Sequence, residues 1–396
     1  MANRNPKILY CTSHCPGFSS YGAQLRALHV GRQLQKIGDV HLLLFPLRSL
    51  DESLLELTRQ AFDLRGVFQL LASPQKGLRE RMHYEFNSRF LDGHGSSIST
   101  ADKSTFLDLA DAYDVVWFHG IRIPNSLGLY NIPRSVLDID DIPSQYHHSA
   151  MKRSDSLIGA MNEARKTFHW RRREKRLLER FNIITVCSEA DRTLLGSSPN
   201  VAVIPNGFES ASLKVGTERS ETPLVGFIGT LEYTPNMDGV RWFISEVWPL
   251  IRQQLPFARL RLVGTKTEVF DAPQDNIDGL GWVQDTDGEI ASWACTIVPI
   301  HIGGGTRIKI AEAFSRQCPV VSTKLGAYGY ELTHGQEILL ADTAAEFSKA
   351  CLDVATDRSL AEGLAKSARL RFEQTLSWDA ILPKVQATIN QALQHT

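Results

Sequence analysis

The segment best suited to chemistry is a glycine-rich run that joins a hydrophobic strand to a helix. The strand predicted at Thr296–Ile300 leads into Gly303-Gly304-Gly305-Thr306-Arg307, and a helix is predicted over Ile308–Gln317. Glycines let the backbone approach a ligand closely, and a helix start offers unpaired N–H groups and a positive dipole end. Arg307 and Lys309 add full charges there. We therefore expect a diphosphate at this turn, which lacks the Gly-Lys-Ser/Thr of a P-loop. A tight turn that needs glycine for its geometry alone is the alternative.

One carboxylate stands on the same predicted helix. Glu312 cannot stabilise a phosphate, but it could accept hydrogen bonds from a ribose diol, as acidic residues do in dinucleotide-binding folds. The alternative is an ion pair with Lys309 or Arg316, both of which lie at helical spacing from it. Spacing alone favours the ion pair.

Two features of the first half could also face a ligand. His119 ends the strand predicted at Val115–Phe118, and a polar residue at the carboxyl end of a parallel strand points into the ligand crevice. The alternative is a capping histidine bonded to backbone. The loop Pro16–Gly22 precedes a helix and could approach the diphosphate, with Gly22 as its main feature, although serine-rich turns before helices are common.

The elements that position these residues alternate between strands and helices in two halves of similar size. In the first half, a strand, a helix and a second strand are predicted at Lys7–Cys11, Ala23–Ile37 and Val40–Phe45, which is the unit of a parallel sheet. Residues Phe208–Thr222 are polar and aperiodic, as in a linker. Further strands are predicted at Ser135–Ile139, Ile183–Cys187, Val201–Ile204, Leu224–Ile228, Arg259–Val263, Ile277–Leu280, Val320–Thr323 and Ile338–Leu340. We therefore predict doubly wound α/β sheets.

Composition narrows the class of protein. The 396 residues are 43% hydrophobic and 22% charged, with a net charge of −1, so no global basic field indicates nucleic acid. Of six cysteines, only Cys11 and Cys15 are close, in a C-x3-C spacing that is a weak metal signal without a partner pair downstream. We interpret the six as free thiols in a reducing compartment. The N-terminus has no long apolar run after its basic residues, and no stretch is long enough to span a bilayer. We expect a cytoplasmic protein.

Taken in order, these segments resemble the retaining glycosyltransferases of family 4. The resemblance covers nearly the whole chain and rests on the glycine-rich turn together with shorter motifs. These are Val203-Ile204-Pro205-Asn206-Gly207, Gly226-Phe227-Ile228-Gly229, Tyr233-Thr234-Pro235-Asn236, Leu262-Val263-Gly264, Gly281-Trp282-Val283, and Cys318-Pro319-Val320-Val321-Ser322-Thr323 with Gly326. The resemblance implies the GT-B fold, in which two Rossmann-like, doubly wound parallel-sheet domains face each other across a cleft.

The same resemblance divides the chain. Residues 1–208 would form the N-terminal, acceptor-side domain, 209–222 the linker, and 223–376 the nucleotide-sugar-binding domain. A last helix is predicted over Trp378–His395 after Ser377, a suitable N-cap residue. It follows the completed second sheet, so we expect residues 377–396 to return to the N-terminal domain.

Roles for individual residues follow from the family's motifs. In a Glu-x7-Glu pair the second glutamate binds the ribose, and Glu312 matches it, whereas Gly304 stands where the first would contact the donor sugar. The turn at 229–233 lacks the usual Arg and Lys, so we infer that Arg307 and Lys309 supply the charge for the diphosphate. Histidines matching His119 often contact the sugar. The candidate nucleotide-binding residues are Gly22, Gly229, Thr230, Val283, Gly304, Gly305, Thr306, Arg307 and Glu312, and the candidate catalytic residues are His119, Arg307 and Lys309.

The implied reaction moves a glycosyl group from a UDP- or GDP-sugar to an acceptor hydroxyl, with retention at the anomeric carbon and no other cofactor. The Gly-Gly-Gly-Thr-Arg form resembles a subgroup associated with exopolysaccharide and cell-surface glycan assembly. Two alternatives stay open. One is a nucleotide-sugar 2-epimerase, and the other is a non-catalytic nucleotide-sugar-binding partner, for which the missing first glutamate leaves room.

Carboxylates at Asp138, Asp140 and Asp141 look at first like a metal site, because alternation places the first two on one face of a strand end and oxygen ligands suit Mg²⁺ or Mn²⁺. GT-B enzymes generally need no bound metal, so we predict none. The interpretation that we favour is that these carboxylates orient acceptor hydroxyls or cap Pro143.

A basic stretch, Lys166–Arg180, carries apolar residues at Trp170, Leu177, Leu178 and Phe181. A helix over 161–181 could lie on an anionic membrane, peripheral to the inner membrane, and meet a lipid-linked acceptor. A solvated charged helix face is the commoner case. The expected partners are therefore a nucleotide-sugar donor and a glycan or lipid-linked acceptor.

Overall fold

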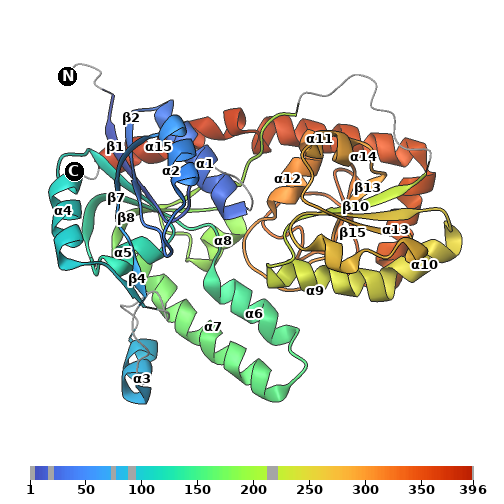
Figure 1. The fold of residues 1–396 in the computed structure, drawn as a ribbon, viewed down its shortest axis with the longest axis horizontal. Coiled ribbons are helices and arrows are strands. Elements are labelled where there is room, and N and C mark those ends of the chain that lie inside the picture. The colour runs from blue at the N-terminus through green and yellow to red at the C-terminus, as the bar shows by residue number, and fades with distance from the viewer. Residues whose placement is uncertain (1–4, 17–21, 73–76, 88–94, 212–221, 395–396) are drawn as a thin grey trace. The chain divides into compact units, whose positions relative to one another are not determined.

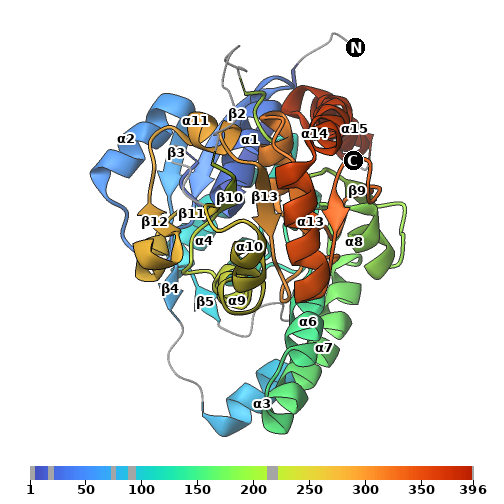
Figure 2. The same ribbon diagram turned by 90° about the vertical axis from the view of Figure 1, so that its right-hand side faces the viewer.

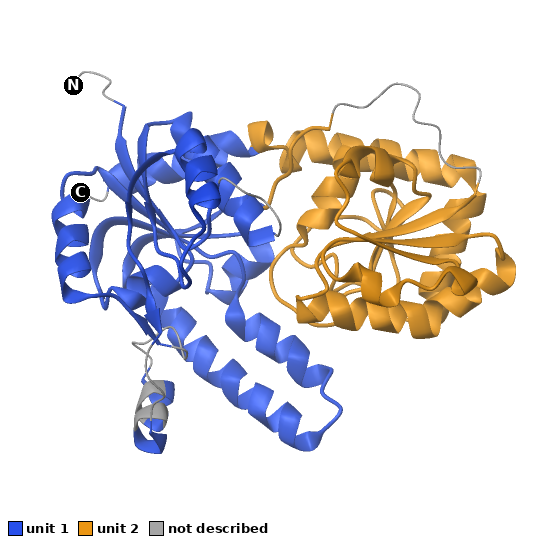
Figure 3. Cartoon of the chain, viewed as in Figure 1, with its two compact units in different colours: residues 1–205, 381–396 blue, residues 206–380 orange. Residues whose placement is uncertain are grey.

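The computed structural model describes residues 5–16, 22–72, 77–87, 95–211 and 222–394. Within these ranges the chain forms two compact units (Figure 3). The first consists of Met1–Pro205 together with Ile381–Thr396, and the second of Asn206–Ala380. Each unit contains a parallel β-sheet with helices packed on it (Figure 1).

The first unit contains a seven-stranded, all-parallel sheet in the order β3-β2-β1-β6-β7-β8-β9. Its central strands β1 and β6 are almost continuously buried, as expected when helices cover both faces, whereas the edge strand β3 is not. The strands are β1 (Lys7–Thr12), β2 (Asp39–Leu44), β3 (Asp63–Val67), β6 (Val115–His119), β7 (Ile132–Asp138), β8 (Phe181–Val186) and β9 (Val201–Val203), with a small antiparallel pair, β4 (Leu71–Ala72) and β5 (Ser96–Ser97).

The helices of this unit are α1 (Gly22–Gln35), α2 (Glu52–Ala61), α3 (Leu78–Phe86), α4 (Thr100–Ala110), α5 (Arg122–Ser126), α6 (Pro143–Lys152), α7 (Leu157–Leu177) and α8 (Glu189–Leu194). Helices α6 and α7 lie side by side as a hairpin (Figures 1 and 2). Among the helices of the described residues, none is long and apolar enough to cross a bilayer.

The second unit contains a six-stranded, all-parallel sheet in the order β12-β11-β10-β13-β14-β15. One hydrophobic cluster includes Val225 and Phe227 of β10, and a second includes Val298 and Phe314. The strands are β10 (Leu224–Ile228), β11 (Arg259–Val263), β12 (Ile277–Gly281), β13 (Cys295–Val298), β14 (Val320–Ser322) and β15 (Leu339–Leu340). The helices are α9 (Thr234–Trp242), α10 (Trp248–Gln254), α11 (Thr286–Ala291), α12 (Ile308–Ser315), α13 (Ala344–Thr356) and α14 (Arg358–Arg371).

The helical stretch over residues 234–254 is interrupted. A π-helical segment, Phe243–Val247, separates α9 from α10 and ends just before Pro249. Proline has no N–H to donate and its ring crowds the carbonyl four residues earlier, so the regular hydrogen-bond register cannot continue there.

The last helix, α15 (Trp378–Gln394), begins after Ser377, whose Oγ accepts a hydrogen bond from the N–H of Ala380 at 3.3 Å. The predicted N-cap is therefore confirmed. From Ile381 onward this helix belongs to the first unit, where the side chain of Gln391 donates to the carbonyl of Pro199 at 3.1 Å.

Strand order defines one switch point in each sheet. It lies between β1 and β6 in the first unit and between β10 and β13 in the second. Open α/β sheets bind ligands beyond the carboxyl ends of the two strands at such a point. His119 ends β6, and the glycine-rich run follows β13, so both candidate regions lie at these positions.

Candidate functional site

The glycine-rich turn of the second unit leads directly into a helix. Gly303 and Gly305 have φ values of +140° and +66°, which side-chain-bearing residues rarely adopt. A Cβ at Gly303 would also collide with Nη2 of Arg307. Arg307 is the N-cap residue of α12 and has an extended backbone there. Glycine at position 303 therefore leaves the space that the guanidinium of Arg307 occupies.

Arg307 is buried, with 7% of its surface exposed, and its side chain folds back onto the turn. Nη1 donates to the carbonyl oxygens of Gly304 and Gly305, the second at 3.3 Å. Nε and Nη2 are buried and have no hydrogen-bond partner among the described residues. Burying a charged donor without a partner costs free energy, and an anion beside these two nitrogens could satisfy them.

Lys309, on the first turn of α12, reaches the turn that follows β10. Its Nζ donates to Oδ1 of Asn236 at 3.0 Å and lies 3.9 Å from the centre of the Phe227 ring. Burial, and then the charge of Arg307, lower the pKa of the Lys309 ammonium to about 7, although Glu312 opposes the shift. A neighbouring anion would favour the charged form.

Gly229 and Thr230 form the turn that Lys309 reaches. Gly229 has φ +148°, and a Cβ on it would lie 2.8 Å from Nδ2 of Asn236 and 3.1 Å from Nζ of Lys309. Nδ2 of Asn236 donates to the carbonyl of Thr230 at 2.8 Å. The structure thus brings Gly229, Thr230 and Lys309 together around Asn236, a residue whose role the sequence did not reveal.

Glu312 lies one turn further along α12. Its Oε1 lies 3.6 Å from Nη1 of Arg316. The same guanidinium makes a shorter contact with Asp287, to which Nε of Arg316 donates at 2.8 Å. Burial raises the pKa of the Glu312 carboxyl, while Arg316 and Lys309 act in the opposite direction. The ion pair considered from spacing therefore exists with Arg316, and its length leaves the carboxylate capacity to accept other hydrogen bonds.

The remaining predicted residues of this unit lie at different places. Thr306 accepts a hydrogen bond from Nδ2 of Asn206 at 3.0 Å, and the hydroxyl of Tyr330 donates to the carbonyl of Arg307 at 3.0 Å. Val283 follows β12 and packs against a hydrophobic cluster. That cluster includes Ile300, which precedes the glycine-rich turn, and Ile310 of α12, which follows it.

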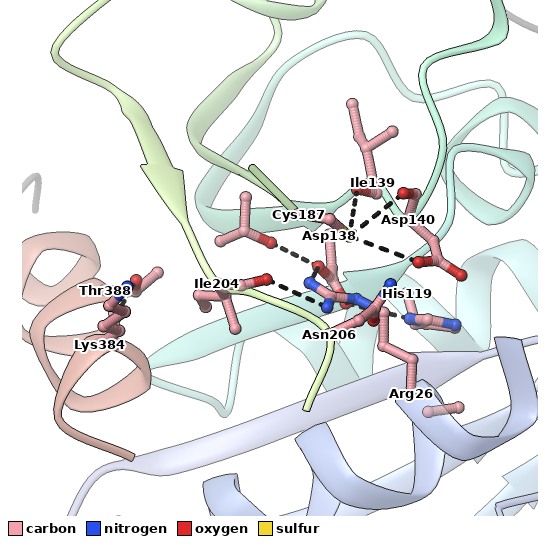
Figure 4. Close-up of polar contacts among 12 residues, drawn as sticks. Arg26, His119, Asp138, Ile139, Asp140, Cys187, Ile204, Asn206, Lys384 and Thr388 are labelled. Atoms are coloured by element: carbon pink, nitrogen blue, oxygen red, sulfur yellow. Dashed lines mark hydrogen bonds and ion pairs between the residues drawn. The ribbon is translucent and has the colours of Figure 1, made fainter. Parts of the chain in front are cut away.

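In the first unit, a buried cluster surrounds Asp138 at the end of β7 (Figure 4). Its carboxylate accepts from Nε and Nη2 of Arg26 at 3.1 and 2.6 Å, from Nδ1 of His119 at 3.1 Å, and from the hydroxyl of Thr185 at 2.6 Å. Nη1 of Arg26 donates to the carbonyl of Ile204 at 3.1 Å. Burial would raise the pKa of Asp138, but Arg26 and His119 hold it well below the usual range of a carboxyl.

His119 is therefore held by a side chain. It is buried at the end of β6, and its ring lies 5.5 Å from that of His14 in an edge-on arrangement. Burial, reinforced by His119, lowers the pKa of His14 to about 3, so the His14 ring is neutral at physiological pH. His119 thus bonds to the Asp138 carboxylate rather than to backbone, as the capping alternative expected. This bond fixes Nδ1 and leaves Nε2 for other contacts.

The aspartates of this region do not act as one set. Asp138 is fully buried in its ion pair, so the suggestion that it orients acceptor hydroxyls is wrong for this residue. Oδ1 of Asp140 accepts instead from the thiol of Cys187 at 3.4 Å. Within the described part of the chain, His, Cys, Asp and Glu side chains form no group of metal ligands. Gly22 begins α1, and the rest of its loop, 17–21, lies outside the described residues.

A comparison with protein families identifies the second unit. The family of glycosyl transferases group 1 matches residues 222–357, which include the glycine-rich turn and α12. We refer to the matched residues as the group 1 domain. The match begins at the linker and ends with α13, so the group 1 domain comprises the six-stranded sheet described above.

Individual relatives are distant. An uncharacterized 44.6 kDa protein in the cps region of Klebsiella pneumoniae is 22% identical over 134 residues, which are 31% of this chain and 34% of that protein. The match thus spans about a third of the relative's length.

Solved structures match nearly the whole chain. HepE of Anabaena, in complex with UDP-glucose, has a TM-score of 0.61 at 16% identity and covers 97% of this chain and 99% of its own. TarM of S. aureus, as a variant in complex with fondaparinux, alpha-GlcNAc-glycerol and UDP, has a TM-score of 0.69 at 12% identity, with 97% and 100% covered. The predicted GT-B fold is confirmed.

Proposed function

We propose that this chain is a glycosyltransferase that moves a sugar from a nucleotide-diphospho-sugar to an acceptor hydroxyl. The observation that carries the proposal is the buried guanidinium of Arg307 at the start of α12, whose Nε and Nη2 have no partner in the described part of the chain. A guanidinium fork matches phosphate oxygens better than any other common anion-binding side chain. The diphosphate of the donor fills this position, beside the Lys309 ammonium and the positive end of the helix.

Glu312 binds the ribose of the donor in this proposal. Its carboxylate makes a 3.6 Å ion pair with Arg316, so lone pairs remain for two hydroxyls of a diol. A UDP- or GDP-sugar is the donor that we propose. The UDP complexes of HepE and TarM support a uridine nucleotide.

The chemistry assigned to these residues is electrostatic. The bond between the anomeric carbon and the diphosphate oxygen breaks, the acceptor oxygen bonds to that carbon on the same face, and the hydroxyl proton passes to the diphosphate. Negative charge grows on the leaving group, and fixed cations stabilise the transition state more than the bound donor. Arg307 and Lys309 have this role, and the family resemblance supports both retention and a sugar contact by His119.

The acceptor in this proposal is a glycan or a lipid-linked sugar of exopolysaccharide or cell-surface glycan synthesis. This assignment rests on the resemblance of the Gly-Gly-Gly-Thr-Arg form and is in keeping with the relative from a cps region. We place the enzyme in the cytoplasm, with peripheral contact to the inner membrane through the basic helix at 161–181.

Thermal shift against UDP-, GDP- and dTDP-sugars, followed by turnover of the stabilising donor, tests this function. Arg307→Ala is the test variant, and Arg358→Ala, whose side chain is 90% exposed on α14, is the matched control. We expect one nucleotide class to raise the Tm of the wild type and of the control, and donor to be consumed only when acceptor is present. Turnover without acceptor would indicate an epimerase or hydrolase, and binding without any turnover would indicate a non-catalytic partner.

A further inference from the structure

A set of large apolar side chains is exposed on the α6–α7 hairpin. Leu157, Ile158 and Met161, at the start of α7, are 85%, 83% and 72% exposed, and Phe168 is exposed further along the same helix. Leu157, Met161 and Phe168 are separated by four and seven residues, which places them on one face of a helix. We refer to Leu157, Ile158, Met161 and Phe168 as the α7 face.

The opposite side of α7 is occupied. Nδ1 of His147 on α6 lies 2.6 Å from Glu163, and Glu174 accepts from the backbone N–H of Ser144 at 2.8 Å. Leu177, which the sequence suggested as part of the apolar surface of this helix, is buried in the core of the unit. The exposed α7 face is therefore a different surface, left over after the hairpin and the core are packed.

Helix α3 extends this surface. Its exposed residues Leu78, Met82 and Phe86 are spaced by four and form a second apolar row. The ring of Phe86 lies 5.0 Å from that of His169 on α7, and Glu85 pairs with Arg165. The two helices thus lie next to each other, which Figure 2 also shows.

Positive charge is concentrated around the same helices. Residues 152–176 contain nine Lys and Arg against three Asp and Glu, a net charge of +6 in a chain whose net charge is −1. Arg165 and Lys166 are paired with Glu85 and Glu163. Four exposed cations make no ion pair with any carboxylate that the structure describes; they are Lys152, Arg171, Arg172 and Lys175.

We propose that the α7 face and the apolar row of α3 bind the surface of an anionic lipid bilayer. Leu157, Ile158 and Met161 insert into the boundary between headgroups and acyl chains, and the flanking cations contact lipid phosphates. Protein–protein interface cores are depleted of charge, whereas a membrane surface favours apolar side chains beside a surplus of cations. The inference extends the membrane contact of the proposed function by naming the residues that make it, and it does not depend on glycosyl transfer.

Vesicle flotation tests the apolar half of this inference. We expect the wild type to float with phosphatidylglycerol vesicles and to remain unbound with phosphatidylcholine vesicles. Leu157→Ser/Ile158→Ser should bind phosphatidylglycerol at least about tenfold more weakly, because both inserted side chains are lost. The matched control is Phe257→Ser, in which an equally exposed apolar residue of the second unit, 83% exposed, is removed. Circular dichroism and Tm confirm that all three proteins are folded.

Two further variants test the contribution of the cations to membrane binding. Arg171→Glu/Arg172→Glu should lose binding by about tenfold or more, whereas Arg171→Lys/Arg172→Lys should keep it, because headgroup attraction depends on charge. Wild-type binding should also weaken with salt.

No flotation, or equal flotation of Leu157→Ser/Ile158→Ser and wild type, would overturn the inference. So would a dimer in sedimentation velocity that the same variant dissociates, because the face would then bind a second copy. None of these results affects donor binding by the group 1 domain.

Discussion

Nζ of Lys309 on α12 lies 3.0 Å from Oδ1 of Asn236 on α9, and Nδ2 of Asn236 donates to the carbonyl of Thr230 in the turn that follows β10. That turn, at 229–233, has none of the Arg and Lys residues usual in the resembling family. Gly229 leaves the space that Lys309 fills, because a Cβ there would lie 3.1 Å from the ammonium. In the proposed function, Lys309 supplies to this turn the positive charge that the turn itself lacks.

Lys309 should make nucleotide binding depend on pH. Its pKa of about 7 in the free protein rises when a diphosphate binds beside it, because the anion favours the ammonium. At about pH 8, binding should therefore take up a proton, and affinity should fall as pH rises above about 7. Calorimetry in two buffers of different ionisation enthalpy measures the uptake. Lys309→Met should abolish it, and an unchanged uptake in that variant would refute the assignment.

Arg307→Ala should lower kcat far more than it weakens nucleotide binding. Loss of a preorganised donor to a developing negative charge typically costs a factor of about 100 to 1,000 in kcat. Arg307→Lys should recover little, because an ammonium does not reproduce the guanidinium fork. Steady-state kinetics with the true acceptor, alongside UDP titration, separates the two effects. Unchanged turnover would show that the guanidinium only shapes the turn.

Glu312→Gln should weaken donor binding by about 1.5–3 kcal/mol, the range for a hydrogen bond to a charged group. The control is Asp287→Asn, which removes the closer partner of Arg316, 2.8 Å away. If Glu312 serves only its ion pair, both variants should lower the Tm and neither should change the donor Kd. A loss of affinity confined to Glu312→Gln supports the ribose contact.

Asp138→Ala should destabilise the first unit by about 3–5 kcal/mol, since it leaves the buried guanidinium of Arg26 without its carboxylate. Arg26→Met/Asp138→Ala should recover part of the loss, because no uncompensated charge then remains. Denaturant unfolding measures both. Equal stability of the single variant and the wild type would contradict the buried ion pair.

The ion pair of Arg26 and Asp138 also predicts that the folded protein loses stability in acid. The pKa of Asp138 is depressed in the folded protein, so its stabilising contribution is complete above the unfolded value of about 3.9 and is lost as pH falls below it. Between about pH 4 and pH 2, the free energy of unfolding should fall more steeply in the wild type than in Arg26→Met/Asp138→Ala. Parallel curves would show that Asp138 is not responsible.

Much of the fold followed from local patterns. The strands β10 and β11 were predicted at their observed bounds, because buried runs of Val, Leu and Ile between polar breaks define parallel strands well. β3 was missed, since its sequence DLRGV alternates polar and apolar residues at a sheet edge and has little hydrophobic signal.

The candidate site was harder to predict from the sequence, because it depends on contacts between segments that are distant along the chain. The approach of Arg26 to Asp138 joins residues 112 apart, and no spacing rule relates them. Asn236 was seen as part of a motif, but its place between Thr230 and Lys309 depends on a contact with a residue 73 positions further along the chain. The sequence did not predict the exposed α7 face either. Leu157 and Leu177 are both leucines of the same helix, and only the folded structure shows that the first is exposed and the second is buried.

The most direct test of the account is a crystal structure of the chain with UDP. We predict the diphosphate within hydrogen-bond distance of Nε or Nη2 of Arg307, with the ribose hydroxyls on Glu312. UDP bound elsewhere in the chain, with both Arg307 nitrogens still unpartnered, would contradict the central claim.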